Sequence, residues 1–368
     1  MSSGIDAKTV GMTTSEPPIT LDDLLVSDAE PLESVNGRLY RAGLADGLPI
    51  VPPTADRVRR MYRDARMDPT EHVGELEPGL KPIRVYHLAV CAVMAGCGPE
   101  HLPVIAAAVQ AMGDPEFNLL GIQTTTGSAA PIFIVNGPGA AKAGISGGAN
   151  CLGGGVRANA CIGRAMRLVL QNLGGATAGG MDMATMGQPA KYGVCFAENE
   201  ALSPWEPLHV ERGFTAEQTV VTAVGISGTV EVVHGSNSEP EEIMLTLAHS
   251  MTIAGNTGGA GLLGGGEPLA VLSYEHAQAL AESGLAKRDV KQFLFEHGRL
   301  PLSLLGKGMA ESIRSRMPPD RDDCLVLARD PDDIMLVVAG GVGIKSTYLP
   351  TWGGGTRAQS VVVWAWAP

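Results

Sequence analysis

The sequence lacks the features that mark membrane, secreted and nucleic-acid-binding proteins. No apolar run approaches the roughly 18 residues that a membrane-spanning helix needs. Residues 1–20 have neither the basic nor the apolar region of a secretory signal, so we expect them to form a disordered tail. Acidic residues outnumber basic ones by 39 to 27, and the net charge of −12 argues against nucleic acid or an anionic membrane as a partner.

Motifs for a structural metal site are absent from the sequence as well. The six cysteines contain no CxxC pair, and no two histidines are spaced as HxxxH. A zinc site therefore has little support, no metal ligand is assigned, and the sequence leaves the cofactor unknown. Because there is no export signal, we expect reduced thiols in a cytoplasmic protein.

The residues that are present indicate a folded enzyme. Apolar residues make up 45% of the chain and charged residues 18%, which is typical of a globular protein. Short apolar runs alternate with helical patterns, which predicts an α/β or α+β fold with mixed sheets and layered helices. The segment TVVTAVGISGTVEVVHG has two β-rich stretches around Gly-Ile-Ser-Gly, which predicts a β-hairpin.

Two segments of the chain share one order of elements: an apolar strand, a turn and two helices. Pro131 stands at the start of the first and Pro268 at the start of the second. We interpret this as an internal duplication of a strand–helix–helix unit. Two unrelated units with ordinary turn residues remain the alternative. We expect an N-terminal half over residues 21–215 and a C-terminal half over residues 216–368.

The stretch NCLGGGVRANACIGRAMRLVLQNLGG, residues 150–175, places a glycine-rich turn directly before a helix. Free backbone N–H groups and the helix dipole favour an anion there, and arginine adds bidentate contacts. The residues predicted to bind an anionic substrate are Gly153, Gly154, Gly155, Arg157 and Asn159. The alternative is a tight turn before a core helix, with its arginines in solvent. The stretch does not have the GxGxxG spacing of dinucleotide-binding proteins.

A second polar cluster follows in MGQPAKYGVCFAENEALSPWEPLH. Its candidate site residues are Gln188, Lys191, Cys195, Glu198, Asn199 and Glu200. The lysine and the two glutamates are catalytic candidates that would move protons, because the glutamates would share one strand face and burial raises a carboxyl pKa. The cysteine is a candidate nucleophile, and the two amides would bind the substrate. A solvated loop after a buried strand is the alternative.

Cys97 is the other candidate nucleophile. It lies just before a helix that has Pro99 in its first turn, a position that can lower a thiol pKa. His101 is close in sequence and could assist. The alternative, for this cysteine as for Cys195, is a buried and unreactive thiol.

The chain resembles a poorly characterised bacterial family whose members are often encoded beside small UGSC-type thiol or selenol proteins. The resemblance is carried by DGLPIVPPTADRV, AGCGPEHLPVIAAAV, NGPGAAKAGI, RANACIGRAMRLVLQNLGG and GQPAKYGVCFAENE, and it covers most of the chain from about Asp46. It implies a catalytic subunit in small-molecule metabolism that works with a thiol-bearing partner, and it assigns no catalytic residue. This chain has no UGSC motif, so such chemistry would need the partner or its own cysteines.

These observations predict an enzyme or catalytic subunit that acts on a small anionic organic substrate by lyase-type or thiol-dependent chemistry. The expected partners are a small anionic metabolite and a small thiol or selenol protein, and we expect an oligomer. One alternative is a metal-dependent hydro-lyase or hydrolase, with carboxylates and a histidine as ligands. Another is a non-catalytic binding subunit of a two-component enzyme.

Overall fold

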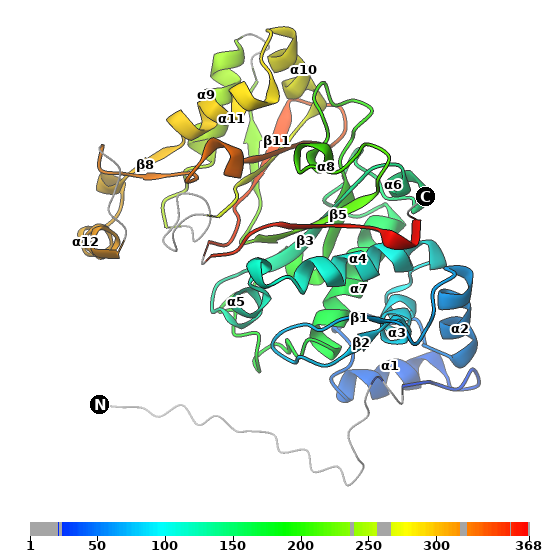
Figure 1. Ribbon diagram of the computed structural model, residues 1–368. Helices are drawn as coiled ribbons and strands as arrows, with labels where there is room; N and C mark the ends of the chain where they lie inside the picture. Colours follow the sequence, from blue (N-terminus) through cyan, green and yellow to red (C-terminus); the bar gives the residue numbers. More distant parts are fainter. Residues whose placement is uncertain are drawn as a thin grey trace, which may run out of the picture.

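Two four-stranded sheets pack face to face, and helices cover the outer face of each sheet (Figure 1). The structure is a computed structural model that describes residues 21, 24–235, 239–255, 266–316, 322–353 and 355–366. The tail expected over residues 1–20 lies outside the described residues. The prediction of mixed sheets with layered helices is confirmed, and the fold is of the α/β type.

The first sheet consists of β3 (Ala130–Asn136), β4 (Val194–Ala197), β5 (Val220–Ile226) and β12 (Gln359–Val362). Its order is β12–β5–β3–β4, with β3 parallel to β4 and the other neighbours antiparallel. The second sheet consists of β6 (Val230–Val233), β7 (Leu269–Leu272), β10 (Met335–Val338) and β11 (Lys345–Leu349). Its order is β10–β7–β11–β6, with β7 parallel to β10 and the other neighbours antiparallel.

Side-chain alternation along the strands gives each sheet two buried faces. In β3, Ile132 and Ile134 pack between the two sheets, whereas Phe133 and Val135 pack against the helices. From the second sheet, inward-facing residues such as Val271 complete the core between the sheets. Every residue of β3 is buried, which explains why this strand reads as a continuous apolar run.

Helices of the N-terminal half share one core with the outer face of the first sheet. They are α1 (Leu32–Arg41), α2 (Ala55–Asp64), α3 (Val85–Ala95), α4 (Leu102–Met112), α5 (Leu119–Thr124), α6 (Gly139–Lys142) and α7 (Arg157–Asn172). The helices on the second sheet are α9 (Pro240–Ser250), α10 (Tyr274–Glu282) and α11 (Lys287–His297).

Smaller elements connect these layers. The short strands are β1 (His72–Gly74) with β2 (Ile83–Arg84), and β8 (Arg299–Pro301) with β9 (Cys324–Val326). The remaining α-helices are α8 (Leu208–Glu211) and α12 (Lys307–Arg316). The 3₁₀ turns are η2 (Pro99–His101), η3 (Pro115–Phe117), η4 (Pro189–Tyr192), η5 (Leu302–Leu304), η6 (Pro331–Asp333) and η7 (Trp364–Trp366).

The predicted duplication is confirmed at the level of topology. With insertions, the first unit runs β3–α6–α7–β4–β5 and the second unit runs β7–α10–α11–β10–β11, with the same strand directions. Pro131 is the second residue of β3, and Pro268 directly precedes β7. Unrelated units would not be expected to share both the order and the directions of their elements.

The strand that follows each of these two units joins the sheet of the other unit. β6 follows β5 after a three-residue turn but pairs with β11, whereas β12 follows β11 but pairs with β5. The hairpin predicted around Gly-Ile-Ser-Gly is therefore wrong, although the chain does turn there. A turn signal is local, and the strand finds its partner through contacts that are distant in sequence. The two units thus interlock through their sheets, and β5 belongs to the first sheet although it lies beyond residue 216, where the second half was expected to begin.

Two glycines let α7 pack directly against the start of β4. A Cβ added to Gly163 would lie 2.7 Å from the carbonyl carbon of Gly193 and from the amide nitrogen of Val194. We expect Gly163→Ala to destabilise the protein by about 1–3 kcal/mol through overpacking, despite alanine's higher helix propensity. Chemical denaturation measures the change. Gly154→Ala is the control, because a Cβ there meets nothing within 4 Å, and equal stabilities of the two variants would contradict this packing.

Candidate functional site

Arg157 and Cys97 line the same pocket, which has a volume of about 380 Å³. We call it the arginine pocket, and the residues that define it are Arg57, Arg60, Asp64, Gly96, Cys97 and Arg157. α2 contributes the first three, the chain after α3 the next two, and the start of α7 the last. The arginines of α2 escaped the sequence prediction, although their three-residue spacing in ADRVRRMYRD indicates one helix face.

The three guanidinium groups of the arginine pocket hydrogen-bond to backbone carbonyls. Arg157 donates from Nε and Nη2 to the carbonyl of Gly96, at 3.2 and 2.8 Å. Arg57 donates to the carbonyl of Pro52 at 2.9 Å. In the described part of the chain none of the three lies within ion-pair distance of a carboxylate. The carboxylate of Asp64 pairs instead with Arg63 at 2.7 Å. Asp64 also lies in the pocket lining and interacts electrostatically with Arg60, so the three arginines and this one carboxylate leave the pocket with an excess of positive charge.

The thiol of Cys97 lies in the wall of the arginine pocket and is 8% exposed. Burial raises the pKa of this thiol well above its ordinary value; the Cys161 thiol raises it further and Arg157 opposes the shift. His101 is not free to act as its base. The ring Nδ1 of His101 accepts a hydrogen bond from the backbone N–H of Gly98 at 3.1 Å, and burial lowers the pKa of the ring. At neutral pH the thiol is therefore protonated.

A second cavity, of about 610 Å³, lies between the edges of the two sheets; we call it the inter-sheet pocket. Gly153 lines it together with the polar residues Asn150, Arg164, Gln188, Tyr192, Thr229, Glu231 and Thr347. Gly153 and Gln188 line this pocket together, whereas Gly154, Gly155 and the candidates from Cys195 to Glu200 are not among its lining residues. The amide of Gln188 donates to the carbonyls of Ser128 and Ile226, at 2.6 and 2.9 Å, so it holds the pocket wall in place.

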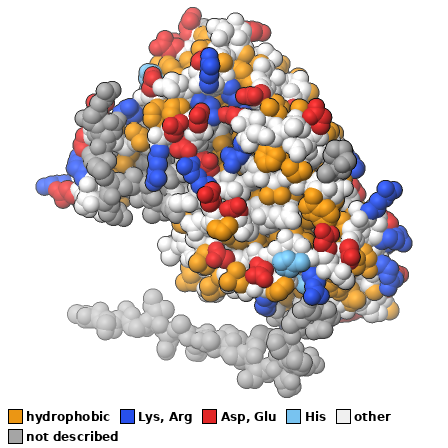
Figure 2. Space-filling model, viewed as in Figure 1, with side chains coloured by type: hydrophobic (Ala, Val, Ile, Leu, Met, Phe, Trp, Pro, Cys, Tyr) orange, Lys and Arg blue, Asp and Glu red, His pale blue; other side chains and the backbone are white. Residues whose placement is uncertain are grey.

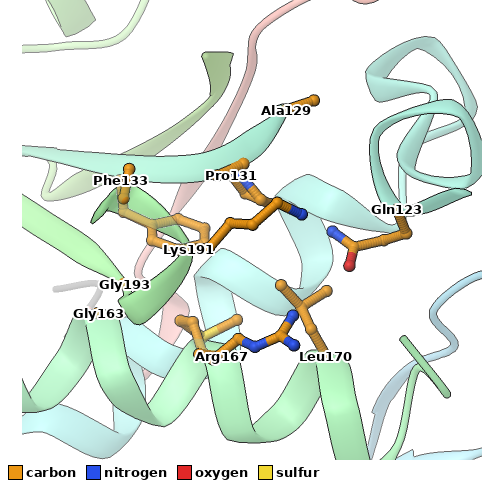
Figure 3. Close-up of a pocket in the computed structure, with 12 residues that line it drawn as sticks. Gln123, Ala129, Pro131, Phe133, Gly163, Arg167, Leu170, Lys191 and Gly193 are labelled. Carbon is orange, nitrogen blue, oxygen red and sulfur yellow. The ribbon is translucent and has the colours of Figure 1, made fainter. Parts of the chain in front are cut away.

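Lys191 lies in a smaller space, the lysine cavity, defined by Gln123, Pro131, Gly163, Arg167, Lys191 and Gly193 (Figure 3). The cavity has a volume of about 20 Å³, enough for one water-sized group. Nζ of Lys191 contacts both carboxylate oxygens of Asp182, at 2.9 and 2.8 Å. The lysine is thus anchored away from both larger pockets.

Glu198 and Glu200 meet at the carboxyl ends of the parallel strands β3 and β4, where ligands often bind in such sheets. Nδ2 of Asn136 donates to both glutamates, at 2.7 and 3.0 Å. We call these residues, with the fully buried His209 of α8, the carboxylate cluster. The sequence predicted that the two glutamates share a face, but it did not identify Asn136 as their partner. Asn136 could have been recognised as a polar residue at the end of a buried strand.

Within the carboxylate cluster, Glu198 and His209 are buried, whereas Glu200 is partly exposed. Glu198 also accepts the backbone N–H of Leu208 at 2.8 Å, and burial raises the pKa of its carboxyl despite the nearby Lys287. His209 lies 3.9 Å from a carboxylate oxygen of Glu200, and neither of its ring nitrogens has a hydrogen-bond partner among the described residues.

The remaining predicted residues serve the fold or stand apart. The side chain of Asn159 accepts from the backbone N–H of Ser146 and donates to the carbonyls of Ser146 and Cys151, so its amide fastens the loop before α7. Gly154 and Gly155 are exposed. Cys195 is buried on the side of β4 that faces the helices, and this burial raises the pKa of its thiol. Asn199 donates its backbone N–H to the carbonyl of Val338. The predicted residues therefore do not form a single cradle.

No described helix is long and apolar enough to cross a membrane. Over the described ranges no group of three histidine, cysteine, aspartate or glutamate side chains is arranged to hold a metal ion. On the face shown in Figure 2, acidic and basic side chains are interspersed, and no continuous basic surface covers it.

Comparisons of the chain with protein-family models, with curated proteins and with solved structures give no match. The family resemblance in the sequence motifs therefore stays a prediction.

Proposed function

We propose that the protein is an enzyme, or the catalytic subunit of one, that binds a small anionic organic substrate in the arginine pocket and acts on it by thiol-dependent chemistry. One observation carries this proposal: three guanidinium groups, none of them in an ion pair with a carboxylate of the described residues, surround a pocket whose wall contains the thiol of Cys97. The proposed setting is the cytoplasm, where the thiol stays reduced.

The size and charge of the pocket support a carboxylate or phosphate ligand. A volume of about 380 Å³ lies within the range of small-molecule sites. Guanidinium groups pair with carboxylates and phosphates through two parallel hydrogen bonds. Arg157 is also the first residue of α7, so the positive end of that helix dipole adds to the field.

The position of the other candidates favours thiol chemistry over lyase-type proton transfer. Lys191 is bound to Asp182 in the lysine cavity, and both glutamates lie in the carboxylate cluster. Among the predicted catalytic residues, only Cys97 lines the same pocket as Arg157.

The protonated state of Cys97 favours a second candidate function. A thiol whose pKa is raised by burial is a poor nucleophile at neutral pH. The chain would then be a binding subunit that presents the anion to a small thiol or selenol partner, as the family resemblance implies. The two candidates share the arginine pocket and differ in which protein supplies the reactive group.

The shared part is tested by the melting temperature of the protein in a panel of mono- and dicarboxylates and organic phosphates at constant ionic strength. We expect at least one compound to stabilise the wild type, and Arg60→Ala to remove most of that effect. Arg59→Ala is the control, because Arg59 lies on the same helix but pairs with Asp56 outside the pocket. Equal stabilisation of both variants would refute binding in the arginine pocket.

The thiol is tested by alkylation with iodoacetamide, followed by peptide mass spectrometry. Because burial raises the pKa of Cys97, we expect slow modification at pH 7 and faster modification as the pH rises. A stabilising anion should slow the reaction further by filling the pocket. If alkylation is unaffected by the anion, then Cys97 does not face the bound ligand.

A further inference from the structure

Three nitrogen-bearing side chains from three separate elements converge on the lysine cavity. Lys191 comes from η4, Gln123 from α5 and Arg167 from α7, and their nitrogen ends point toward one another (Figure 3). Pro131 and Leu170 supply apolar walls beside them. The cavity thus presents hydrogen-bond donors in an otherwise apolar surrounding.

The charges around the cavity do not balance. Asp182, which is 6% exposed, contacts Nζ of Lys191 at 2.8 Å and Nη1 of Arg167 at 3.6 Å. Asp46, the other carboxylate that acts on Arg167, already forms two hydrogen bonds to Arg164, at 2.8 and 2.9 Å. Two partly buried cations therefore share one carboxylate, which leaves one positive charge without a dedicated partner. Such a charge is costly to bury alone.

Gln123 turns its amide nitrogen toward Nζ of Lys191 (Figure 3). The side chain is buried, at 2% exposure, and its Oε1 has no hydrogen-bond partner among the described residues. That oxygen is an acceptor, so it calls for a donor such as water and does not itself favour an anion. Two nitrogen donors that face each other across a small space do favour an acceptor between them.

We propose that the lysine cavity binds one monoatomic anion of the size of chloride, held by Lys191, Arg167 and the amide of Gln123. The volume of about 20 Å³ admits a group of this size and leaves no room for a carboxylate or phosphate ligand. The site is distinct from the arginine pocket and does not depend on the proposed function.

The anion would stabilise the wall between two cavities. Ala190 and Gly193 line both the lysine cavity and the inter-sheet pocket, so the turn η4 separates the two spaces. An anion bound to Lys191 in the lysine cavity would hold η4 in its present conformation, and this turn also forms part of the wall of the inter-sheet pocket. Chloride would therefore act as a structural ligand of this turn.

The test compares melting temperatures in sodium chloride and in sodium gluconate at equal ionic strength, because gluconate is too large for the cavity. We expect the wild type to gain about 2 °C for each tenfold rise in chloride above its dissociation constant. Gln123→Glu places a carboxylate between the two cations, so it should melt higher in gluconate and lose the chloride response. The control Gln292→Glu, an exposed change on α11, should keep that response.

Crystals of the wild-type protein grown in sodium bromide provide a readout that does not depend on any variant. We expect an anomalous bromide peak in the cavity, within about 3.5 Å of Nζ of Lys191. Water density without an anomalous peak would overturn the proposal. So would a chloride response that is absent from the wild type or unchanged in Gln123→Glu.

Discussion

Arg157→Ala is expected to weaken binding of the anionic ligand by about ten- to a hundred-fold, while the melting temperature stays close to that of the wild type. A hydrogen bond between charged groups contributes about 1.5–3 kcal/mol, which corresponds to this loss of affinity. The side chain is exposed and lies off the apolar face of α7, and its one described partner is the carbonyl of Gly96. Water can replace the guanidinium at that carbonyl. Calorimetry with the best ligand of the panel measures the change.

Two further variants sharpen this experiment. Arg157→Lys keeps the charge but loses the planar pair of donors, so its affinity should fall between those of the wild type and the alanine variant. Arg59→Ala should bind like the wild type. An alanine variant that melts far lower would show that Arg157 serves the fold, and one that binds normally would show that its guanidinium faces only solvent.

Local sequence patterns predicted the helices and strands of this fold better than they predicted which strands pair with one another. The apolar run of β3 and the helical spacing of α7 are both as expected, because each depends on neighbours within a few residues. The turn after β5 was also foreseen, whereas the exchange of β6 into the second sheet was not. That exchange is decided by the inner faces of two sheets, whose residues come from opposite ends of the chain.

The candidate site was predictable to the same extent. Arg157 and Cys97 were each singled out, but nothing local shows that α2 brings Arg57 and Arg60 beside them. Asn159, in contrast, was predicted to bind the substrate but serves the fold. An amide after a glycine-rich turn can bind a ligand or fasten the turn itself, and here its hydrogen bonds go to the loop backbone. Only the three-dimensional partners distinguish the two uses.

Glu198→Ala is expected to destabilise the protein by about 3–5 kcal/mol. The carboxylate accepts hydrogen bonds from the amide of Asn136 and from the backbone N–H of Leu208, and it faces the N–H of Val338 at 3.4 Å. Truncation leaves the N–H groups of Leu208 and Val338 without this acceptor, while Asn136 keeps only its bond to Glu200, at about 1–3 kcal/mol for each lost bond. Chemical denaturation at several pH values measures the change.

The pH dependence of that loss follows from the raised pKa of Glu198. Because burial disfavours the ionised form, the folded protein binds the proton more tightly than the unfolded chain, whose carboxyl has a pKa near 4.5. The stabilising contribution of Glu198 is therefore fully present below pH 4.5 and declines as the pH rises toward the folded-state pKa. The difference in unfolding free energy between wild type and Glu198→Ala should shrink over the same interval.

Glu200→Ala is the comparison that separates burial from loss of charge. Glu200 shares the amide of Asn136, but its side chain keeps 29% of its exposure, so water can replace part of what it provides. We expect a smaller loss of stability from this variant, about 1–2 kcal/mol. If Glu198→Ala were no more destabilising than Glu200→Ala, or if its penalty grew with pH, the buried carboxyl would not hold the ends of β3 and β4 together as its contacts indicate.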